Sequence, residues 1–338
     1  MIASREEIDF SFGVIGDLQF FDGDDGSQYG DPKRVRRYRA ALVKFEEAVR
    51  FFRNCSVMNS PPLHLCILLG DTIDGKCEQD GTSNAAFARV TDVLSRQNLN
   101  GPRWHFLVGN HDLYNFTRDQ LYEKEQYVPL SVRSECSPQK LYYSIQPHPR
   151  YLFVFLDPFE ISTCGGVSQA AKDEAQQLLI QKNPNLSNGG SWLNGLDAAT
   201  QRYVPYNGAC SMNQLVWLEL ELSKSRVQGQ KVFVFCHCPL YMPCCRPSGL
   251  AWNADDILIL LQRSGNVVAC FYGHDHDGGY ACDSTGIHHI LPPAVLEAGE
   301  EHQAYGVVSV SRDGLHLQWT GQPPPSTYDW PQHMLFTK

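Results

Sequence analysis

Six short runs of apolar residues recur along the chain, and each of them ends in a cluster of polar residues. The runs are FSFGVIGDLQF, LHLCILLGDTID, WHFLVGNHD, YLFVFLD, KVFVFCHCPL and VVACFYGHDH. Apolar runs without alternation are typical of strands that are buried on both faces, as in sheets covered by helices. Helical patterns lie between the runs, at residues 35–52, 85–97 and 213–226. This alternation predicts a layered α/β architecture.

Two further segments complete the expected organisation. The last third of the chain contains IHHILPPAV, AYGVVSVSR and LHLQWTG, and we expect antiparallel strands there to complete a second sheet. Residues 160–210 are rich in Gly, Asn, Ser and Gln, with one short helical stretch at residues 169–181. Long loops in compact domains are usually functional or disordered. We therefore interpret residues 1–338 as one domain with an insertion at about 160–210, near the rim of a site.

The composition narrows the range of partners. The chain has 338 residues, of which 43% are apolar, and a net charge of −9, whereas nucleic-acid binders usually carry an excess of Lys and Arg. The opening residues MIASREEIDF do not resemble a targeting signal, and the apolar runs are too short to span a membrane. The 12 cysteines include no CxxC pair. We expect a cytoplasmic monomer with reduced thiols and with no nucleic-acid or membrane partner.

The polar clusters at the strand ends contain candidate metal ligands. They supply Asp17, Gln19, Asp71, Asp74, Asn110, His111, His237, His274 and His276. In open α/β sheets ligands bind beyond the carboxyl ends of the strands, so these clusters can converge in space. Oxygen and imidazole donors without thiolates suit Mn²⁺, Mg²⁺ or iron. Each residue taken singly is more often a turn residue or an ordinary polar group, but the ordered set predicts a metal site.

This ordered set resembles the calcineurin-like metallophosphoesterase family. The family pattern of DxH, GDxxD, GNH(D/E), a His and GHxH is matched in order from Asp17 to His276, except that Gln19 stands where the family usually has His. An amide oxygen is a harder donor than imidazole and favours Mn²⁺ or Mg²⁺. Together with GNHD, CHCP and GLAWN, this Gln resembles the manganese-dependent ADP-ribose/CDP-alcohol diphosphatases. The resemblance implies a four-layer α/β/β/α sandwich with mixed sheets.

The resemblance also implies roles for individual residues. Two divalent cations, Mn²⁺ in preference to Mg²⁺, would be held by Asp17, Gln19 and His276 on one side and by Asn110, His237 and His274 on the other, with Asp71 as the bridge. A metal-bridging hydroxide would attack the diphosphate of a small nucleotide conjugate in line. His111 would be the general acid, and Asp74 would orient it.

The residues of the substrate pocket and the type of reaction are less well defined by the sequence than the metal ligands. Tyr29, Leu196 and Gly249 are candidate pocket residues because their segments flank strands that carry ligands. A cyclic-nucleotide phosphodiesterase, a protein phosphatase or a phosphomonoesterase could use the same scaffold. A non-catalytic interaction module is disfavoured, because every ligand position holds a competent donor.

Overall fold

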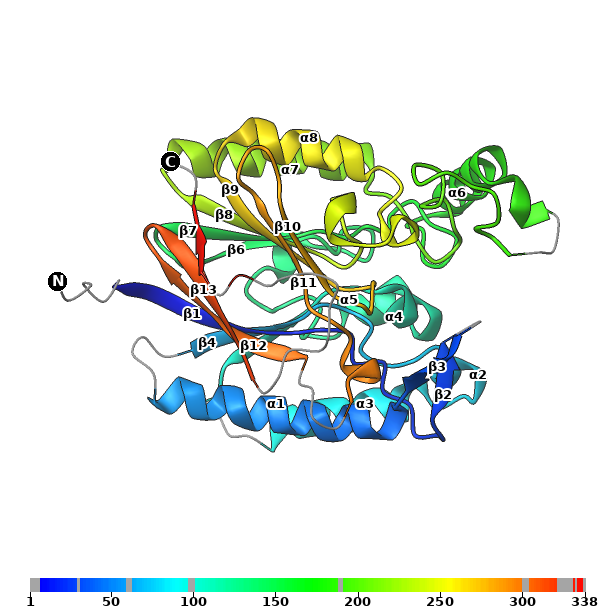
Figure 1. The fold of residues 1–338 in the computed structure, drawn as a ribbon, viewed down its shortest axis with the longest axis horizontal. Helices are drawn as coiled ribbons and strands as arrows, with labels where there is room; N and C mark the ends of the chain where they lie inside the picture. The colour runs from blue at the N-terminus through cyan, green and yellow to red at the C-terminus, as the bar shows by residue number, and fades with distance from the viewer. Residues whose placement is uncertain are drawn as a thin grey trace.

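The computed structural model describes most of the chain. The described residues are 7–28, 31–58, 63–96, 101–187, 191–299, 304–320, 331 and 333–336. They form two six-stranded mixed sheets that pack face to face, with helices on the outer face of each sheet (Figure 1). The predicted four-layer α/β/β/α sandwich is confirmed.

The first sheet contains both the first strand and the last strands of the chain. Its strands are, in spatial order, β14 (His333–Leu335), β13 (Gly314–Trp319), β12 (Tyr305–Ser311), β1 (Ile8–Ile15), β4 (Leu63–Leu68) and β5 (Arg103–Phe106). Strands β1, β4 and β5 run parallel, and β12 pairs with the other edge of β1 in antiparallel direction. The three parallel strands therefore end at one edge of the sheet.

The second sheet is built around a parallel core. Its strands are, in spatial order, β10 (Gly279–Cys282), β11 (His288–Leu291), β9 (Val267–Tyr272), β8 (Lys231–Cys236), β7 (Tyr151–Phe155) and β6 (Tyr143–His148). Strands β7, β8, β9 and β11 are parallel, while β6 and β10 are antiparallel edge strands. The carboxyl ends of β8 and β9 lie at the same edge of the molecule as those of β1 and β4 (Figure 1).

Long helices cover the outer faces of both sheets. Helices α1 (Tyr38–Met58) and α3 (Ser83–Ser95) lie against the first sheet, and α7 (Met212–Val227) and α8 (Ala254–Ser264) lie against the second (Figure 1). Helix α7 begins where the Ser211 hydroxyl accepts a hydrogen bond from the Gln214 N–H, and α8 ends at Gly265 in a left-handed conformation. Helices α2 (Lys76–Gln79), α4 (Asn110–Asn115) and α5 (Arg118–Tyr122) at the loop-bearing edge are short, and α6 (Gln169–Lys182) is the longer helix there.

Phenylalanine side chains from both sheets pack together with aliphatic residues in the space between the sheets. Phe12 from β1 contacts Phe153 from β7 with ring centroids 5.0 Å apart, and Phe271 from β9 at 5.6 Å, both edge to face. All three rings are fully buried. Burial of each such ring contributes about 1.5–3 kcal/mol relative to exposure. This core fixes the two sheets relative to each other and so brings their strand ends together.

The insertion predicted at residues 160–210 projects beyond the ends of the sheets, on the side where the parallel strands terminate (Figure 1). Its helix α6 begins at Gln169, as predicted, with Ser168 as N-cap. A small apolar cluster of Ala175, Leu179 and Ala209 packs on Trp252, which lies just before α8. The insertion is thereby attached to the GLAWN loop.

Two expectations from the sequence were wrong. The C-terminal strands β12 and β13 complete the first sheet, because the free edge of β1 accepts them, and only β10 and β11 extend the second. The first long helix begins at Tyr38 and not near Val35, because residues 31–36 form the strand β3, which pairs with β2 (Gly26–Gln28).

Within the described part of the chain, no helix has the length and apolarity that a membrane span requires. All twelve cysteines are free thiols, and eight of them are buried.

Candidate metal centre

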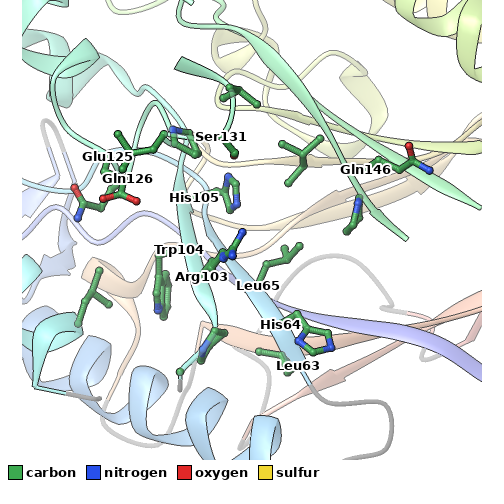
Figure 2. A pocket seen from close by; sticks show the side chains of 18 of the residues that line it. Leu63, His64, Leu65, Arg103, Trp104, His105, Glu125, Gln126, Ser131 and Gln146 are labelled. Atoms are coloured by element: carbon green, nitrogen blue, oxygen red, sulfur yellow. The ribbon is translucent and has the colours of Figure 1, made fainter. Parts of the chain in front are cut away.

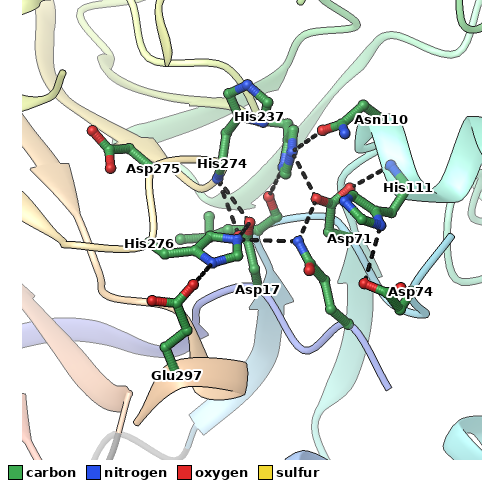
Figure 3. Close-up of polar contacts among 12 residues, drawn as sticks. Asp17, Asp71, Asp74, Asn110, His111, His237, His274, Asp275, His276 and Glu297 are labelled. Carbon is green, nitrogen blue, oxygen red and sulfur yellow. Dashed lines mark hydrogen bonds and ion pairs between the residues drawn. The ribbon is translucent and has the colours of Figure 1, made fainter. Parts of the chain in front are cut away.

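The candidate ligands come together at the carboxyl-end edge of the two sheets (Figure 3). Each follows a strand end. Asp17 and Gln19 follow β1, Asp71 follows β4, Asn110 begins α4 after β5, His237 follows β8, and His274 and His276 follow β9. All except His274 are buried below 8% exposure. The convergence that the sequence predicts is thus present in the structure.

One half of the centre contains two imidazoles and an amide. The ligand atoms of Asp71, His237 and His274 all lie within 4.8 Å of one another. Nε2 of His237 is 3.5 Å from Oδ2 of Asp71 and 3.3 Å from Oδ1 of Asn110. Three donors at these distances leave a space that a divalent cation can occupy.

The other half contains Asp17, Gln19 and His276. Nε2 of His276 is 3.6 Å from Oδ2 of Asp17 and 3.1 Å from Nε2 of Gln19, and the Gln19 amide also donates to Oδ2 of Asp71 at 3.0 Å. Asp71 is therefore shared by the two halves, as a bridging ligand must be. The buried Oε1 of Gln19 has no hydrogen-bond partner. A half-turn of the amide would present this oxygen to a cation, so the donor set fits a metal.

The orientation of each histidine is fixed by a hydrogen bond on its outer side. Nδ1 of His237 bonds the Leu69 carbonyl at 2.7 Å, and Nδ1 of His276 bonds Oε1 of Glu297 at 2.6 Å. His274 uses Nε2 instead and bonds Oδ1 of Asn207 at 2.6 Å. Such outer partners set the tautomer, so Nε2 of the first two rings and Nδ1 of His274 are left as donors toward the centre.

Glu297 and Asn207 were not among the residues that we predicted. Glu297 ends the run IHHILPPAVLE, so the rule of a polar residue after an apolar run could have found it. Asn207 lies in the insertion, where no periodic pattern marks it. Both are buried or nearly so, and Glu297 is held further by Arg34, whose guanidinium lies 2.8 Å from Oε2.

Backbone strain is concentrated at the candidate ligands. Among the described residues, the non-glycine residues with positive φ are Gln19 (42°), Asp71 (53°) and His274 (71°). A side chain costs free energy in this left-handed region, and such strain tends to persist at functional sites. A Cβ atom at Gly109 would collide with the Asp71 carboxylate. The glycine before Asn110 is thus needed for the close approach of the two loops.

The carboxylates and histidines strongly affect each other's ionisation. Burial alone would raise the pKa of Asp71, but the rings of His237 and His111 hold it well below its usual range. Burial alone would lower the pKa of His237, but Asp71 and Asp17 raise it to about 9. The pKa of His276 is likewise raised to about 9, against its burial, by hydrogen bonds with Asp17 and Glu297. A cation that binds here must displace protons from both histidines.

Asp112 holds the bridging loop in place. Its carboxylate accepts hydrogen bonds from the backbone N–H groups of Asp71 and Thr72, both at 3.0 Å, and of Gly109 at 2.9 Å. The Tyr127 hydroxyl donates to it at 2.6 Å. Burial and the charge of Asp71 raise the pKa of Asp112 to about 7. This fully buried residue therefore connects the loops after β4 and β5.

His111 and Asp74 lie beside Asp71, the residue that the two halves share (Figure 3). The His111 backbone N–H donates to Oδ1 of Asp71 at 2.8 Å, and its Nδ1 accepts from the Gly75 N–H at 2.9 Å. Oδ2 of Asp74 is 3.4 Å from the same Nδ1 and has no hydrogen-bond partner of its own. In the neutral ring the proton is therefore on Nε2, while Asp74 lies close enough to stabilise a protonated ring. The predicted roles of both residues stay predictions.

The three candidate pocket residues lie in different places relative to the metal centre, and one of them is outside the described residues. Tyr29 lies outside the described residues. Gly249 is buried, and a Cβ atom there would come within 3.9 Å of the His274 ring. Leu196 is half-buried in a turn of the insertion, where its N–H bonds the Leu193 carbonyl at 3.3 Å. Gly249 therefore borders the centre, and the contact of Leu196 with a substrate stays a prediction.

A separate pocket of about 1270 Å³ opens between the edge strands β5 and β6 (Figure 2). His64, His105, Arg103, Gln126 and Gln146 are among its lining residues. None of the predicted ligands lines it. The candidate metal centre is thus independent of this pocket.

Comparison with known proteins identifies the family of the chain. The family model described as calcineurin-like phosphoesterase matches residues 10–278, which include every candidate ligand. The chain belongs to the calcineurin-like phosphoesterase family. This confirms the resemblance that the motifs from Asp17 to His276 indicated.

Two relatives and one solved structure illustrate where this calcineurin-like phosphoesterase lies within its family. It is 33% identical to the manganese-dependent ADP-ribose/CDP-alcohol diphosphatase of Homo sapiens, over 97% of this chain and 94% of the human protein. It is 32% identical to the Arabidopsis thaliana protein of the same name, over 97% of this chain and 99% of that protein. The crystal structure of a dimetal phosphatase from Danio rerio superposes with a TM-score of 0.86 at 27% identity, covering 98% and 100% of the two chains.

Proposed function

We propose that this metallophosphoesterase hydrolyses the diphosphate linkage of small nucleotide conjugates, namely ADP-ribose and CDP-alcohols of the CDP-choline type. The observation that carries the proposal is the pair of donor groups that share Asp71, which suits a two-metal phosphoesterase. The substrate class is supported by the names of relatives that match this chain over more than nine-tenths of its length. The alternatives on the same scaffold have no observation of their own in their favour.

Each candidate ligand has a proposed place. Asp17, Gln19 and His276 would hold one cation, Asn110, His237 and His274 the other, and Asp71 would bridge them. The harder amide oxygen of Gln19 and the names of the manganese-dependent relatives support Mn²⁺ over Mg²⁺. When bound, the two cations would neutralise the phosphoryl oxygens and lower the pKa of an attacking water.

The remaining chemistry belongs to the side chains of the protein. His111 would act as the general acid in its protonated form, with the Asp74 carboxylate 3.4 Å from Nδ1 to balance the charge of the ring. It would donate the proton of Nε2 to the leaving oxygen, and the ring would be left neutral. Asp74 would hold the ring in this orientation through its charge. The backbone bond from His111 to Asp71 keeps this acid next to the bridging carboxylate.

A substrate panel tests the proposed reaction. ADP-ribose, CDP-choline, cyclic AMP, p-nitrophenyl phosphate and a phosphopeptide would be compared after chelation and reloading with Mn²⁺ or Mg²⁺. We expect the highest kcat/KM for ADP-ribose or CDP-choline with Mn²⁺. A preference for p-nitrophenyl phosphate, the phosphopeptide or cyclic AMP would contradict the substrate class.

The role of His111 has its own test. We expect His111→Ala to lower kcat by about 10²- to 10⁴-fold while the metal content stays nearly unchanged, because general acid catalysis is typically worth that much. The exposed His64, outside the metal centre, provides the control variant His64→Ala. Loss of bound metal in His111→Ala would contradict the assigned role.

We also propose that the protein is a cytoplasmic monomer. The twelve free thiols support a reducing compartment, where disulfides are rare. Cell fractionation tests the localisation, and a secreted protein would contradict it. Sedimentation of the purified protein tests the oligomeric state, and a dimer would contradict it.

A further inference from the structure

We propose that Trp192 and Tyr206 form a stacking platform for the nucleobase of the substrate, and that Asn207 fixes this platform to the metal centre. All three residues belong to the insertion. The inference deepens the proposed function, because a nucleotide conjugate has a base that must lie outside the metal centre.

The platform is a series of rings that begins at a candidate ligand. The Tyr206 ring lies 5.6 Å from the His274 ring, centroid to centroid, and the Trp192 ring lies 6.2 Å from Tyr206 on the insertion. Trp192 is 43% exposed, whereas Tyr206 is mostly buried. The series therefore runs from the metal centre toward solvent and ends in an indole ring that a ligand can reach.

The exposed indole is carried by a fixed backbone. The fully buried Asn183 donates from Nδ2 to the Trp192 carbonyl at 3.1 Å and to the Tyr203 carbonyl at 2.8 Å. Asn185 donates to the same Trp192 carbonyl at 3.3 Å. A single exposed aromatic residue is common on a protein surface. Here, however, a buried amide holds the chain on both sides of the loop, so the indole is presented in a defined place.

Asn207 connects this platform to the metal centre. It follows Tyr206 directly and is fully buried. Its Oδ1 accepts from Nε2 of His274 at 2.6 Å, and its Nδ2 donates to the carbonyls of Arg202, Ser248 and Leu250 at 2.8, 2.8 and 3.0 Å. One side chain thus joins the insertion, the GLAWN loop and a candidate ligand. This amide therefore fixes the position of the platform relative to His274.

The chemistry of stacking matches the breadth of the proposed substrates. Every nucleobase has a π-face, so stacking on an aromatic ring binds purines and pyrimidines alike. The cations would select the diphosphate, and the platform would add affinity for adenine and cytosine conjugates without selecting between them. The platform therefore acts on nucleoside-containing ligands and not on the sugar phosphate or alcohol phosphate part.

Binding of reaction products tests the platform without turnover. The dissociation constants of AMP, CMP and ribose 5-phosphate would be measured by calorimetry on the Mn²⁺-loaded protein. We expect Trp192→Ala to raise the dissociation constants of AMP and CMP by about 5- to 150-fold, which corresponds to about 1–3 kcal/mol for one stacked base. The dissociation constant of ribose 5-phosphate should stay unchanged. Trp192→Phe should retain most of the affinity.

The controls separate this inference from the proposed function. Leu220→Ala removes an apolar side chain of similar exposure (55%) on α7 and should change none of the three constants. An equal effect of Trp192→Ala on AMP and ribose 5-phosphate, or no effect on either, overturns the platform, even when ADP-ribose is hydrolysed. A protein that fails to hydrolyse ADP-ribose but loses AMP affinity in Trp192→Ala supports the platform and contradicts only the reaction.

Discussion

Two edges of this molecule bury histidines, and the pKa values of His237 and His276 at one edge shift in the opposite direction to that of His105 at the other. At the metal edge, carboxylates contact His237 and His276 and raise the pKa of each ring to about 9. At the edge formed by β5 and β6, His105 bonds the Tyr143 hydroxyl at 3.1 Å and stacks on Phe155 at 5.3 Å. Burial and the charge of Arg103 lower its pKa to about 4. In the metal-free protein at pH 7, His237 and His276 are thus positively charged and His105 is neutral. His274, which also lies at the metal edge, has its pKa held well below the usual value by burial and by the neighbouring His237.

The difference shows what a metal centre requires beyond buried imidazoles. The fold buries His105 among aromatic side chains, where a neutral ring packs well. At the metal edge three loops bring acidic side chains to the rings, and this excess of negative charge is what a pair of cations neutralises. The following predictions test this contrast, beginning with the largest effect.

Replacing the shared carboxylate should have the largest effect. We expect Asp71→Asn to lower kcat/KM by about 10³-fold or more, because both halves of the centre lose the same anionic donor. Steady-state kinetics and metal analysis check this, with Asp80→Asn, an exposed carboxylate, as the control. Near-normal activity in Asp71→Asn would mean that Asp71 does not bridge two cations.

The pH dependence of metal binding should be the next largest effect. His237 and His276 have pKa values of about 9, so at lower pH a proton occupies the nitrogen that a cation needs. Apparent Mn²⁺ affinity should therefore rise about tenfold per pH unit for each histidine up to about pH 9 and then level off. Mn²⁺ titrations of the metal-free protein at pH 7, 8 and 9 measure the slope. A flat profile would show that His237 and His276 are as neutral as His105.

The outer partner of His276 should contribute less than the ligands. We expect Glu297→Gln to weaken cation binding by about 10- to 100-fold, because the hydrogen bond that orients the ring loses its charge. Asp277→Asn is a matched control. Asp277 also pairs with Arg34, but its side chain is half-exposed and does not bond the His276 ring. Equal weakening in both variants would point to Arg34 rather than to the ring.

The smallest effect should appear at the other edge. The folded-state pKa of His105 is about 4 and the usual value is 6.5, so between these pH values the unfolded chain binds a proton that the folded protein does not. The free energy of unfolding should therefore fall by about 1 kcal/mol per pH unit as the pH drops from 6.5 to 4. Urea unfolding gives the free energy of unfolding of the metal-free wild-type protein and of His105→Gln at each pH. The difference between the two pH slopes is the contribution of His105. Identical slopes would mean that His105 is protonated in the folded protein.

Much of the centre could be predicted because its candidate ligands are tied to strand ends. A buried strand can be recognised from a few consecutive apolar residues, and parallel strands end at one edge, so Asp17, Asp71 and His237 could be expected to meet. The close approach of the loops after β4 and β5 is visible only in the structure, where a Cβ atom at Gly109 would collide with the Asp71 carboxylate. The first helix was placed too early because the basic residues of β3 have no strand periodicity of their own.

The sequence alone determined which side chains could act as donors and in what order along the chain they occur, because these residues follow short apolar runs that can be identified locally. Only the tertiary structure decided which nitrogen of each histidine faces the centre, since that depends on Leu69, Glu297 and Asn207. It also decided that Trp192 and Tyr206 extend the centre toward solvent. Hydrogen bonds between distant loops fix the histidine orientations and the placement of the two rings. The sequence of a loop has no repeating pattern from which its contacts could be predicted.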